Sequence, residues 1–295
     1  MMKSSVAEDP QGVGDPEAFA FVQALAAELS KGKVDLPSFP DIALRVRQVL
    51  ADEQVTQDKV VRVVGSEPAL AARLMQIANS AAINFTGKPI SELRTAIARM
   101  GFNMVRSAAI AFAMSQLKKV DSLKGLEQPL DDLWQRSAAV AAMSHAVARR
   151  FSGVNPDTAM LAGLLHGIGK LYILTRSNRH PGLFANQAAY NAIVRDWHAP
   201  VARALLENWE MAEEIITAVS EYEDFGREHD GAPDLTDALT VGHLLAAFKE
   251  HPDTLELNMH DVAACKRMKI DRASYEKLID ESESEIEALR QALGV

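Results

Sequence analysis

Several features that mark other protein classes are scarce in this sequence of 295 residues. It has one cysteine, Cys265, which excludes an intramolecular disulfide and a thiolate zinc cluster and fits a reducing compartment. The longest apolar runs, such as Ala108–Met114, are too short to span a bilayer. Residues 1–17 are polar and acidic and lack the apolar core of a signal peptide. These absences predict a soluble, cytoplasmic protein that has no membrane partner.

Basic blocks and alternating segments are also missing. The formal net charge is -9, so a phosphate backbone would be repelled and nucleic acid is not an expected partner. No run alternates apolar and polar residues with a period of two, which argues against a β-sheet. The composition, with 48% hydrophobic and 24% charged residues, is that of a globular protein with a real core. The expected fold class is therefore all-α.

The chain in order predicts a flexible leader over 1–16 and helices from residue 17 onward. Gly101 is expected to end a helix with a left-handed cap, and residues 120–129 are expected to be a linker. Asp131 and Asp132 are expected to open a long helix that ends near Phe151. Further on, separate helices are expected over 185–194, over 200–209 starting at Pro200, and over 212–222.

The segment Met160–Leu171 is the most informative stretch. Asn155-Pro156-Asp157 is a helix start signal, and the apolar helix after it delivers one imidazole, His166, directly before Gly167 and Gly169. A histidine at the end of a buried helix is either a metal ligand or a helix-end group. In the second interpretation the imidazole bonds a free carbonyl, and the helix dipole favours its charged form.

Other chemical interpretations of the sequence are weaker. Gly167–Lys170 is not a phosphate-binding loop, because Leu164 stands where a glycine is required and Leu171 replaces the hydroxyl. His229-Asp230 lies in a Gly/Pro-rich loop, and Asp261 of His260-Asp261 is expected to cap a helix, so neither pair is expected to be a buried metal site. His145 and His243, both inside helices, are expected to be half-buried residues with one hydrogen bond each. Cys265 has no placed base, and no nucleophile-elbow motif is present.

Several motifs together resemble the HDOD domain. They are Leu36-Pro37-x-x-Pro40, Glu67–Leu74, Ile77–Ala81, Ile90-Ser91 through Ile97, Met100-Gly101 with the following Val105-Arg106, and Leu161–Leu171. The last of these is similar to the family's Leu-Leu-His-Asp-Ile-Gly-Lys-Leu segment. The resemblance covers about residues 30–250. It implies an N-terminal HDOD bundle over 17–120, a degenerate HD-like bundle over 130–250 and a C-terminal helical extension with an amphipathic helix over 253–295.

The resemblance also implies that this chain lacks metal ligands that the catalytic relatives have. HDOD domains are related to the HD-domain metal-dependent phosphohydrolases, but they generally lack the full ligand set. The first histidine of an active enzyme corresponds to Arg136, and the aspartate of its pair corresponds to Gly167. The later histidines correspond to His198 and to positions near Tyr222 and Glu223, and the late aspartate corresponds to Gly242 or His243. Together with His166 and Lys170, these positions are expected to form a vestigial pocket without a metal or cofactor.

The expected function is a non-catalytic, bacterial signal-transduction module that regulates through protein–protein interaction. Its partners would be signalling proteins of unknown identity, and a homo-oligomer is left open. One alternative is a metal-dependent phosphohydrolase acting on a nucleotide or cyclic dinucleotide, with a metal held by His166, His198 and an acid such as Asp157 or Glu223. Another is a ligand sensor in which Arg136 and Lys170 bind an anion.

Overall fold

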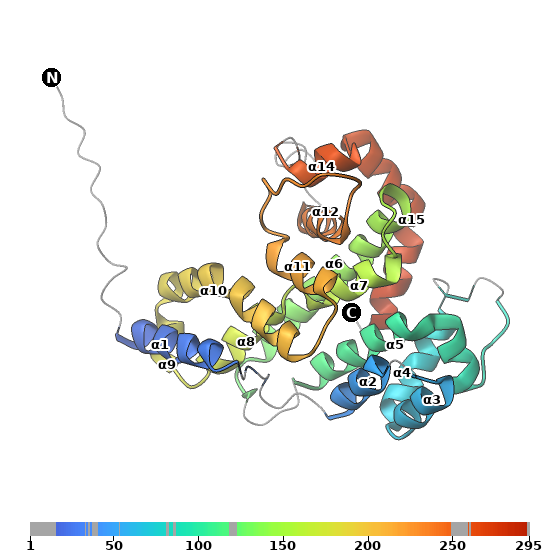
Figure 1. The fold of residues 1–295 in the computed structure, drawn as a ribbon, viewed down its shortest axis with the longest axis horizontal. Coiled ribbons are helices and arrows are strands. Elements are labelled where there is room, and N and C mark those ends of the chain that lie inside the picture. Colours follow the sequence, from blue (N-terminus) through green and yellow to red (C-terminus); the bar gives the residue numbers. More distant parts are fainter. Residues whose placement is uncertain are drawn as a thin grey trace.

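Every regular element that the computed structural model describes is a helix (Figure 1), which confirms the all-α class. The described residues are 16–32, 34, 36, 41–52, 54–80, 83–84, 87–117, 123–248, 259 and 261–293. The helices are α1 (Pro16–Ser30), α2 (Asp41–Ala51), α3 (Gln57–Gly65), α4 (Pro68–Asn79), α5 (Leu93–Leu117), α6 (Glu127–Phe151), α7 (Pro156–Leu165), α8 (Ile168–Ser177), α9 (Pro181–Ala185), α10 (Gln187–Asn208), α11 (Glu213–Glu221), α12 (Leu235–Phe248), α14 (Ala263–Met268) and α15 (Arg272–Leu293).

Helices α2, α3 and α4 pack against α5 and form the first bundle (Figure 1). Apolar residues at helical spacing face this contact, among them Val46 of α2 and Leu70 and Leu74 of α4, all fully buried. Gly101 has φ 74° and ψ 166° and kinks α5. The positive φ is as the sequence predicts, but ψ is extended and the helix continues, so Gly101 forms a kink and not the expected left-handed cap. Beyond the kink α5 continues to α7, so this helix joins the first bundle to the second.

In the second bundle, α6 is the central helix, and it packs along α7 and α12 while α8 packs on α10. Three glycines lie where these helices touch. A Cβ atom on Gly163 would lie 2.5 Å from Cα of Ala141, and one on Gly242 would lie 2.8 Å from Cα of Ser144. A Cβ on Gly169 would lie 1.9 Å from the carbonyl oxygen of His198. The helices of this bundle therefore meet backbone against backbone.

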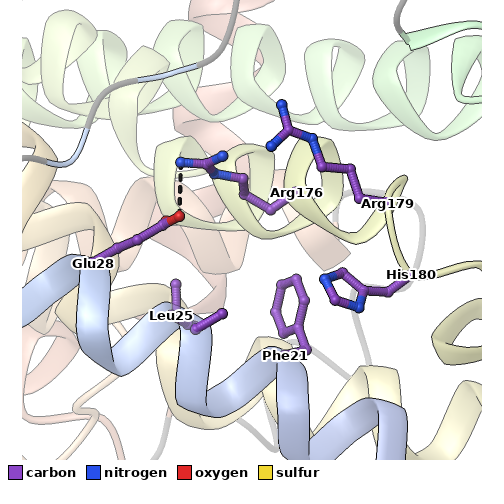
Figure 2. A pocket seen from close by; sticks show the side chains of 7 residues that line it. Phe21, Leu25, Glu28, Arg176, Arg179 and His180 are labelled. Carbon is purple, nitrogen blue, oxygen red and sulfur yellow. Dashed lines mark ion pairs between the residues drawn. The ribbon is translucent and has the colours of Figure 1, made fainter.

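Helix α1 docks on α9 and α10 of the second bundle. Phe21 and Leu25 are each 3% exposed, and the Phe21 ring meets the His180 ring edge-on at a centroid distance of 5.3 Å. Figure 2 shows Phe21, Leu25 and Glu28 facing Arg176 and His180 across a small pocket of about 160 Å³. The Glu28 carboxylate pairs with Arg176 at 2.9 Å, so an ion pair closes one end of this contact.

Helix α15 contacts both bundles, because it packs along α6 and also touches α4 and α5 (Figure 1). The short helix α14 before it packs on α12. The stretch Pro156–Ser177 is long and apolar enough to cross a membrane, but 94% of its 18-residue apolar window is buried inside the protein. Its apolar character is therefore that of a core segment.

The structure corrects three expected helix boundaries. α10 is one helix that runs through Pro200, although proline removes a backbone donor there, because buried residues such as Ile193 and Leu205 continue one apolar face across it. α6 begins at Glu127, before Asp131 and Asp132. Val262, not Asp261, is the N-cap of α14. The leader up to residue 15, residues 118–122 of the expected linker, and His260 lie outside the described residues, and the domain boundaries remain predictions.

Candidate functional site

The site begins where α7 ends and α8 starts. Asn155 caps the start of α7, as its sequence predicts, because its side chain accepts hydrogen bonds from the backbone of Asp157 and Thr158. At the other end His166 is the C-cap and Gly167 is the N-cap of α8. The short turn between two buried helices carries the imidazole into the interior, where it is 1% exposed.

His166 bonds a free helix carbonyl, which is the helix-end arrangement that the sequence suggests. Its Nδ1 lies 2.7 Å from the carbonyl oxygen of Gly163, so Nδ1 carries the hydrogen. The expected charge is wrong, however. Burial lowers the pKa of His166 well below its ordinary value, and the neighbouring His243, Lys170 and Arg136 lower it further. His166 is therefore a neutral imidazole, because desolvation outweighs the helix dipole.

The rings of His166, Tyr222 and His243 pack together at the site. The His166 and Tyr222 rings meet edge-on at 5.4 Å between centroids, and the His243 ring lies 5.6 Å from His166 and 4.9 Å from Tyr222. His243 is 8% exposed, and its Nδ1 is buried without a hydrogen-bond partner among the described residues. Burial, together with Arg136 and Lys170, lowers the pKa of His243 to about 4. The expectation of a half-buried histidine with a hydrogen bond is wrong, because α12 turns this ring into the cluster.

A charged network adjoins the rings. The ammonium of Lys170 lies 2.7 Å from Oε1 of Glu223 and donates to the hydroxyl of Tyr222 at 3.2 Å. Nε2 of His198 lies 2.9 Å from the other oxygen, Oε2, of Glu223, and the Tyr222 hydroxyl donates to Oε1 at 2.8 Å. Both oxygens of this carboxylate are thus engaged by donors from α8 and α10.

The network sets the charge of its members. Burial raises the pKa of Glu223, but the bonds from His198 and Lys170 outweigh it and hold that pKa far below the ordinary range. Burial and the adjacent Glu223 raise the pKa of the Tyr222 hydroxyl well above 10. Near neutral pH the site therefore contains a neutral phenol, a carboxylate and an ammonium.

Two positions differ most from a metal site. Gly167 offers no ligand, and a Cβ atom there would lie 3.2 Å from Oγ of Ser137 and 3.3 Å from Cδ1 of Leu133. These contacts are tight but do not exclude a side chain, so what position 167 lacks is a carboxylate rather than space. Arg136 of α6 is exposed and lines the same groove as Lys170. The position that the resemblance matches to the first histidine of an active enzyme thus carries a permanent cation.

The described structure brings together His166, Lys170, His198, Tyr222 and Glu223, with Arg136 and Gly167 beside them. It does not bring Asp157 to them, because Asp157 stands in the first turn of α7, nine residues before His166, about 13 Å along the helix. Asp157 instead lies 3.8 Å from Nε2 of His145. The sequence suggests His243 as an ordinary helix histidine and as a correspondence shared with Gly242. Nothing local marks it as part of the site, because the rings that it meets come from other parts of the chain.

His229 also has a setting that the sequence does not reveal. Its Nε2 lies 2.9 Å from Oδ2 of Asp237, which is 2% exposed, and 3.6 Å from Asp234. These three residues have ligand atoms within 4.8 Å of one another. Arg227 already pairs with Asp234 at 2.8 Å and Arg267 pairs with Asp237, so both carboxylates are compensated by guanidinium groups. This cluster is an ion-pair network that fastens α14 to α12.

An open groove with a volume of about 790 Å³ lies beside the charged network. Helices α6, α8, α10, α12 and α15 and the short α9 contribute to its walls. The residues that give it chemical character are Arg136, Lys170, Phe184, Tyr190 and Arg290. The groove is within the size range of small-molecule sites. Arg290 was not singled out from the sequence, because it lies 120 residues after Lys170 on a helix with more acidic than basic residues.

Comparison with protein families gives a match to the HDOD domain over residues 36–225. The chain belongs to the HDOD family. The match includes α2 to α11 and therefore His166 and its network, whereas α1, α12, α14 and α15 lie outside it. A comparison with curated proteins gives no match.

Solved structures share the fold. A candidate metal-dependent phosphohydrolase from Shewanella amazonensis SB2B is 24% identical with a TM-score of 0.77, and the match covers 95% of this chain and 100% of that one. An HDOD domain protein of unknown function from Geobacter sulfurreducens is 22% identical with a TM-score of 0.62, covering 92% and 96% of the two chains. A candidate signal transduction protein from Marinobacter aquaeolei VT8 is 18% identical with a TM-score of 0.60, covering 97% of this chain and 68% of that one.

Proposed function

We propose that this HDOD protein is a non-catalytic regulatory module of bacterial signal transduction that acts in the cytoplasm by binding signalling proteins. The observation that carries the proposal is the engagement of Glu223. Its two oxygens are bonded by Lys170 and His198, so the carboxylate of the cluster is compensated by the protein itself. A site that activates water needs that negative charge for a metal ion.

The charges around the network also oppose a divalent ion. Lys170 lies 2.7 Å from the carboxylate that would bind the metal, and Arg136 adds a second cation. Gly167 supplies no bridging carboxylate, and Asp157 lies at the far end of α7. A metal would have to displace an ammonium and bind beside a guanidinium with only imidazoles and one carboxylate as ligands. The module is therefore proposed to need no metal or cofactor.

The framework around the site argues for a retained structural role. The backbone contacts at Gly163, Gly169 and Gly242 hold the second bundle rigidly, and α5 and α15 connect it to the first. A rigid two-bundle body presents a fixed surface to another protein, which reduces the conformational cost of binding. The fold shared with the Marinobacter protein is in keeping with a signalling role, and neither nucleic acid nor membrane is proposed as a partner.

Metal analysis of the purified protein tests the non-catalytic part. We expect substoichiometric iron, manganese and zinc, and no hydrolysis of p-nitrophenyl phosphate or nucleotides when these metals or magnesium are added. Tightly bound metal near one ion per chain, lost in His166→Ala, would overturn the proposal, as would metal-dependent hydrolysis lost in the same variant. Circular dichroism of that variant is the control for folding.

The interaction part needs a separate measurement. A tagged chain expressed in its native bacterium is captured, and co-purifying proteins are identified and then produced in pure form. We expect at least one signalling protein to bind the pure chain directly, and binding to persist in Lys170→Met, which opens the network without removing the outer surface. Failure of every purified candidate to bind directly would contradict this part.

A further inference from the structure

The groove beside the network differs in charge from the rest of the molecule. The chain carries a net charge of -9, yet three cations from three helices line this groove, Arg136 of α6, Lys170 of α8 and Arg290 of α15. The acidic residue that lines it with them is Asp132. A local concentration of cations in an acidic protein attracts small anions rather than polyanions, because the surrounding surface repels extended negative charge.

Two of these cations, Arg136 and Arg290, have guanidinium N–H groups without a hydrogen-bond acceptor among the described residues. Arg136 has no ion-pair or hydrogen-bond partner among the residues that the structure describes. Nε of Arg290 is buried and has no hydrogen-bond partner among them, and a carboxylate oxygen of Glu287 lies 3.7 Å from Nη1. Lys170, in contrast, is held by Glu223. Unsatisfied guanidinium donors at a concave surface favour a ligand with phosphate or carboxylate oxygens, which guanidinium binds in bidentate geometry.

The groove also has an aromatic wall. The rings of Phe184 and Tyr190 lie 5.3 Å apart, tilted by 36°, and both residues are partly exposed. Side-chain amides of Gln187 and Asn191 stand beside them and are bonded to each other at 3.1 Å. A flat ring can pack on such a wall, and amides can bond the edge of a heteroaromatic ring.

From these observations we propose that the groove binds a small organic anion that carries both a phosphate or carboxylate group and a flat ring. Arg136 and Arg290 bind the anionic group, and Phe184 and Tyr190 bind the ring. The groove volume of about 790 Å³ accommodates a ligand of this size. The inference rests on the proposed function, because the groove is treated as a site of binding without turnover.

Arg290 gives this binding a mechanical consequence. It lies on α15, which packs along α6 and touches α4 and α5 of the first bundle. An anion held by both Arg136 and Arg290 ties α15 to α6 more firmly, and the contacts of α15 with the first bundle are then stabilised too. α12 and α15 lie outside the part of the chain that matches the family, so this groove is a feature of the whole chain.

Isothermal titration calorimetry in EDTA tests the inference with three probes: adenosine 5′-monophosphate, inorganic phosphate and adenosine. We expect the monophosphate to bind most tightly. Arg136→Gln and Arg290→Gln should each weaken it about tenfold or more, the effect of one lost charge-assisted bond. Arg62→Gln removes the same charge from the exposed face of α3 and should leave binding unchanged. Ligand should also slow backbone hydrogen exchange in α15.

Absence of binding by the monophosphate, or equal binding by all three arginine variants, overturns the inference while leaving the non-catalytic proposal intact. Equal affinity for phosphate and the monophosphate overturns the role of the aromatic wall. Hydrolysis of the monophosphate, followed by phosphate release with added metal, overturns the proposed function instead. Thermal unfolding of each variant shows whether it is folded, and Arg136→Lys, which keeps the charge but not the bidentate fork, should fall between wild type and Arg136→Gln.

Discussion

Replacing His243 by glutamine should make the protein less sensitive to acid. The His243 imidazole is 8% exposed, and burial with the cations Arg136 and Lys170 lowers its pKa from 6.5 to about 4. Between these two pKa values the His243 imidazole is protonated in the unfolded chain and neutral in the folded chain. The free energy of unfolding therefore decreases as the pH falls from about 6.5 to about 4. Glu223 opposes this effect, whereas His198 adds to it.

The magnitude follows from the two pKa values. At about pH 5 the difference between 6.5 and about 4 corresponds to a loss of about 2 kcal/mol, and below the folded pKa the loss approaches about 3 kcal/mol. His166, whose pKa is lowered in the same direction, adds to the fall in the wild type and remains in the variant. The free energy of unfolding of His243→Gln should therefore fall by about 2 kcal/mol less between about pH 7.5 and about pH 5.

Urea unfolding followed by circular dichroism at the two pH values measures this difference. The change in the free energy of unfolding between the two pH values is taken for each protein separately. Any effect of the substitution on packing against Tyr222 that does not depend on pH therefore cancels. His180→Gln removes an imidazole at the pocket under α1, outside the ring cluster, and is the matched control. Equal pH dependence in the wild type and His243→Gln would show that the ring is not held neutral in the folded state, and the assigned electrostatics of the site would then be wrong.

Three further predictions concern the frame of the molecule. Gly169→Ala should lower the free energy of unfolding, measured in urea, by about 3 kcal/mol, because the new methyl group would lie 1.9 Å from a backbone oxygen. Gly153→Ala is the control and should change it by less than about 1 kcal/mol, because no atom lies within 4 Å of the new methyl group. Similar losses in the two variants would refute the close helix contact at Gly169. Asp237→Asn should cost about 3 kcal/mol in thermal unfolding, because it leaves the largely buried Arg267 uncompensated, and an unchanged midpoint would contradict this. Phe21→Ala should raise hydrogen exchange in α1 alone, and an equal rise in α6 would show that α1 is part of the core.

The sequence predicts the local structure of the site well. Asn155-Pro156 marks the start of α7, the apolar run after it is buried, and His166 bonds a carbonyl at the helix end, all from signals within a dozen residues. Gly101 likewise kinks α5 where its freedom at positive φ is needed. These features are set by nearby residues, so periodicity and capping preferences are sufficient to find them.

What the sequence does not reveal depends on contacts between distant segments. The neutral state of His166 follows from rings and cations on other helices, and so does the position of His243. Arg290 joins the groove because of the path of α15, and an amphipathic pattern gives a buried face without naming its partner. The predicted helix start at Pro200 is wrong for the opposite reason. Its local signal is strong, but buried residues on both sides continue the helix through it.

The glycine contacts also bear on how such a protein changes over time. Where helices are spaced by side chains, each substitution in a pocket shifts the frame, and new chemistry must evolve together with new packing. In this bundle Gly163, Gly169 and Gly242 fix the spacing through backbone atoms alone. Residues of the pocket, such as those at positions 136 and 167, can therefore be exchanged while the scaffold keeps its shape. Such a scaffold can acquire a new ligand without first losing its fold.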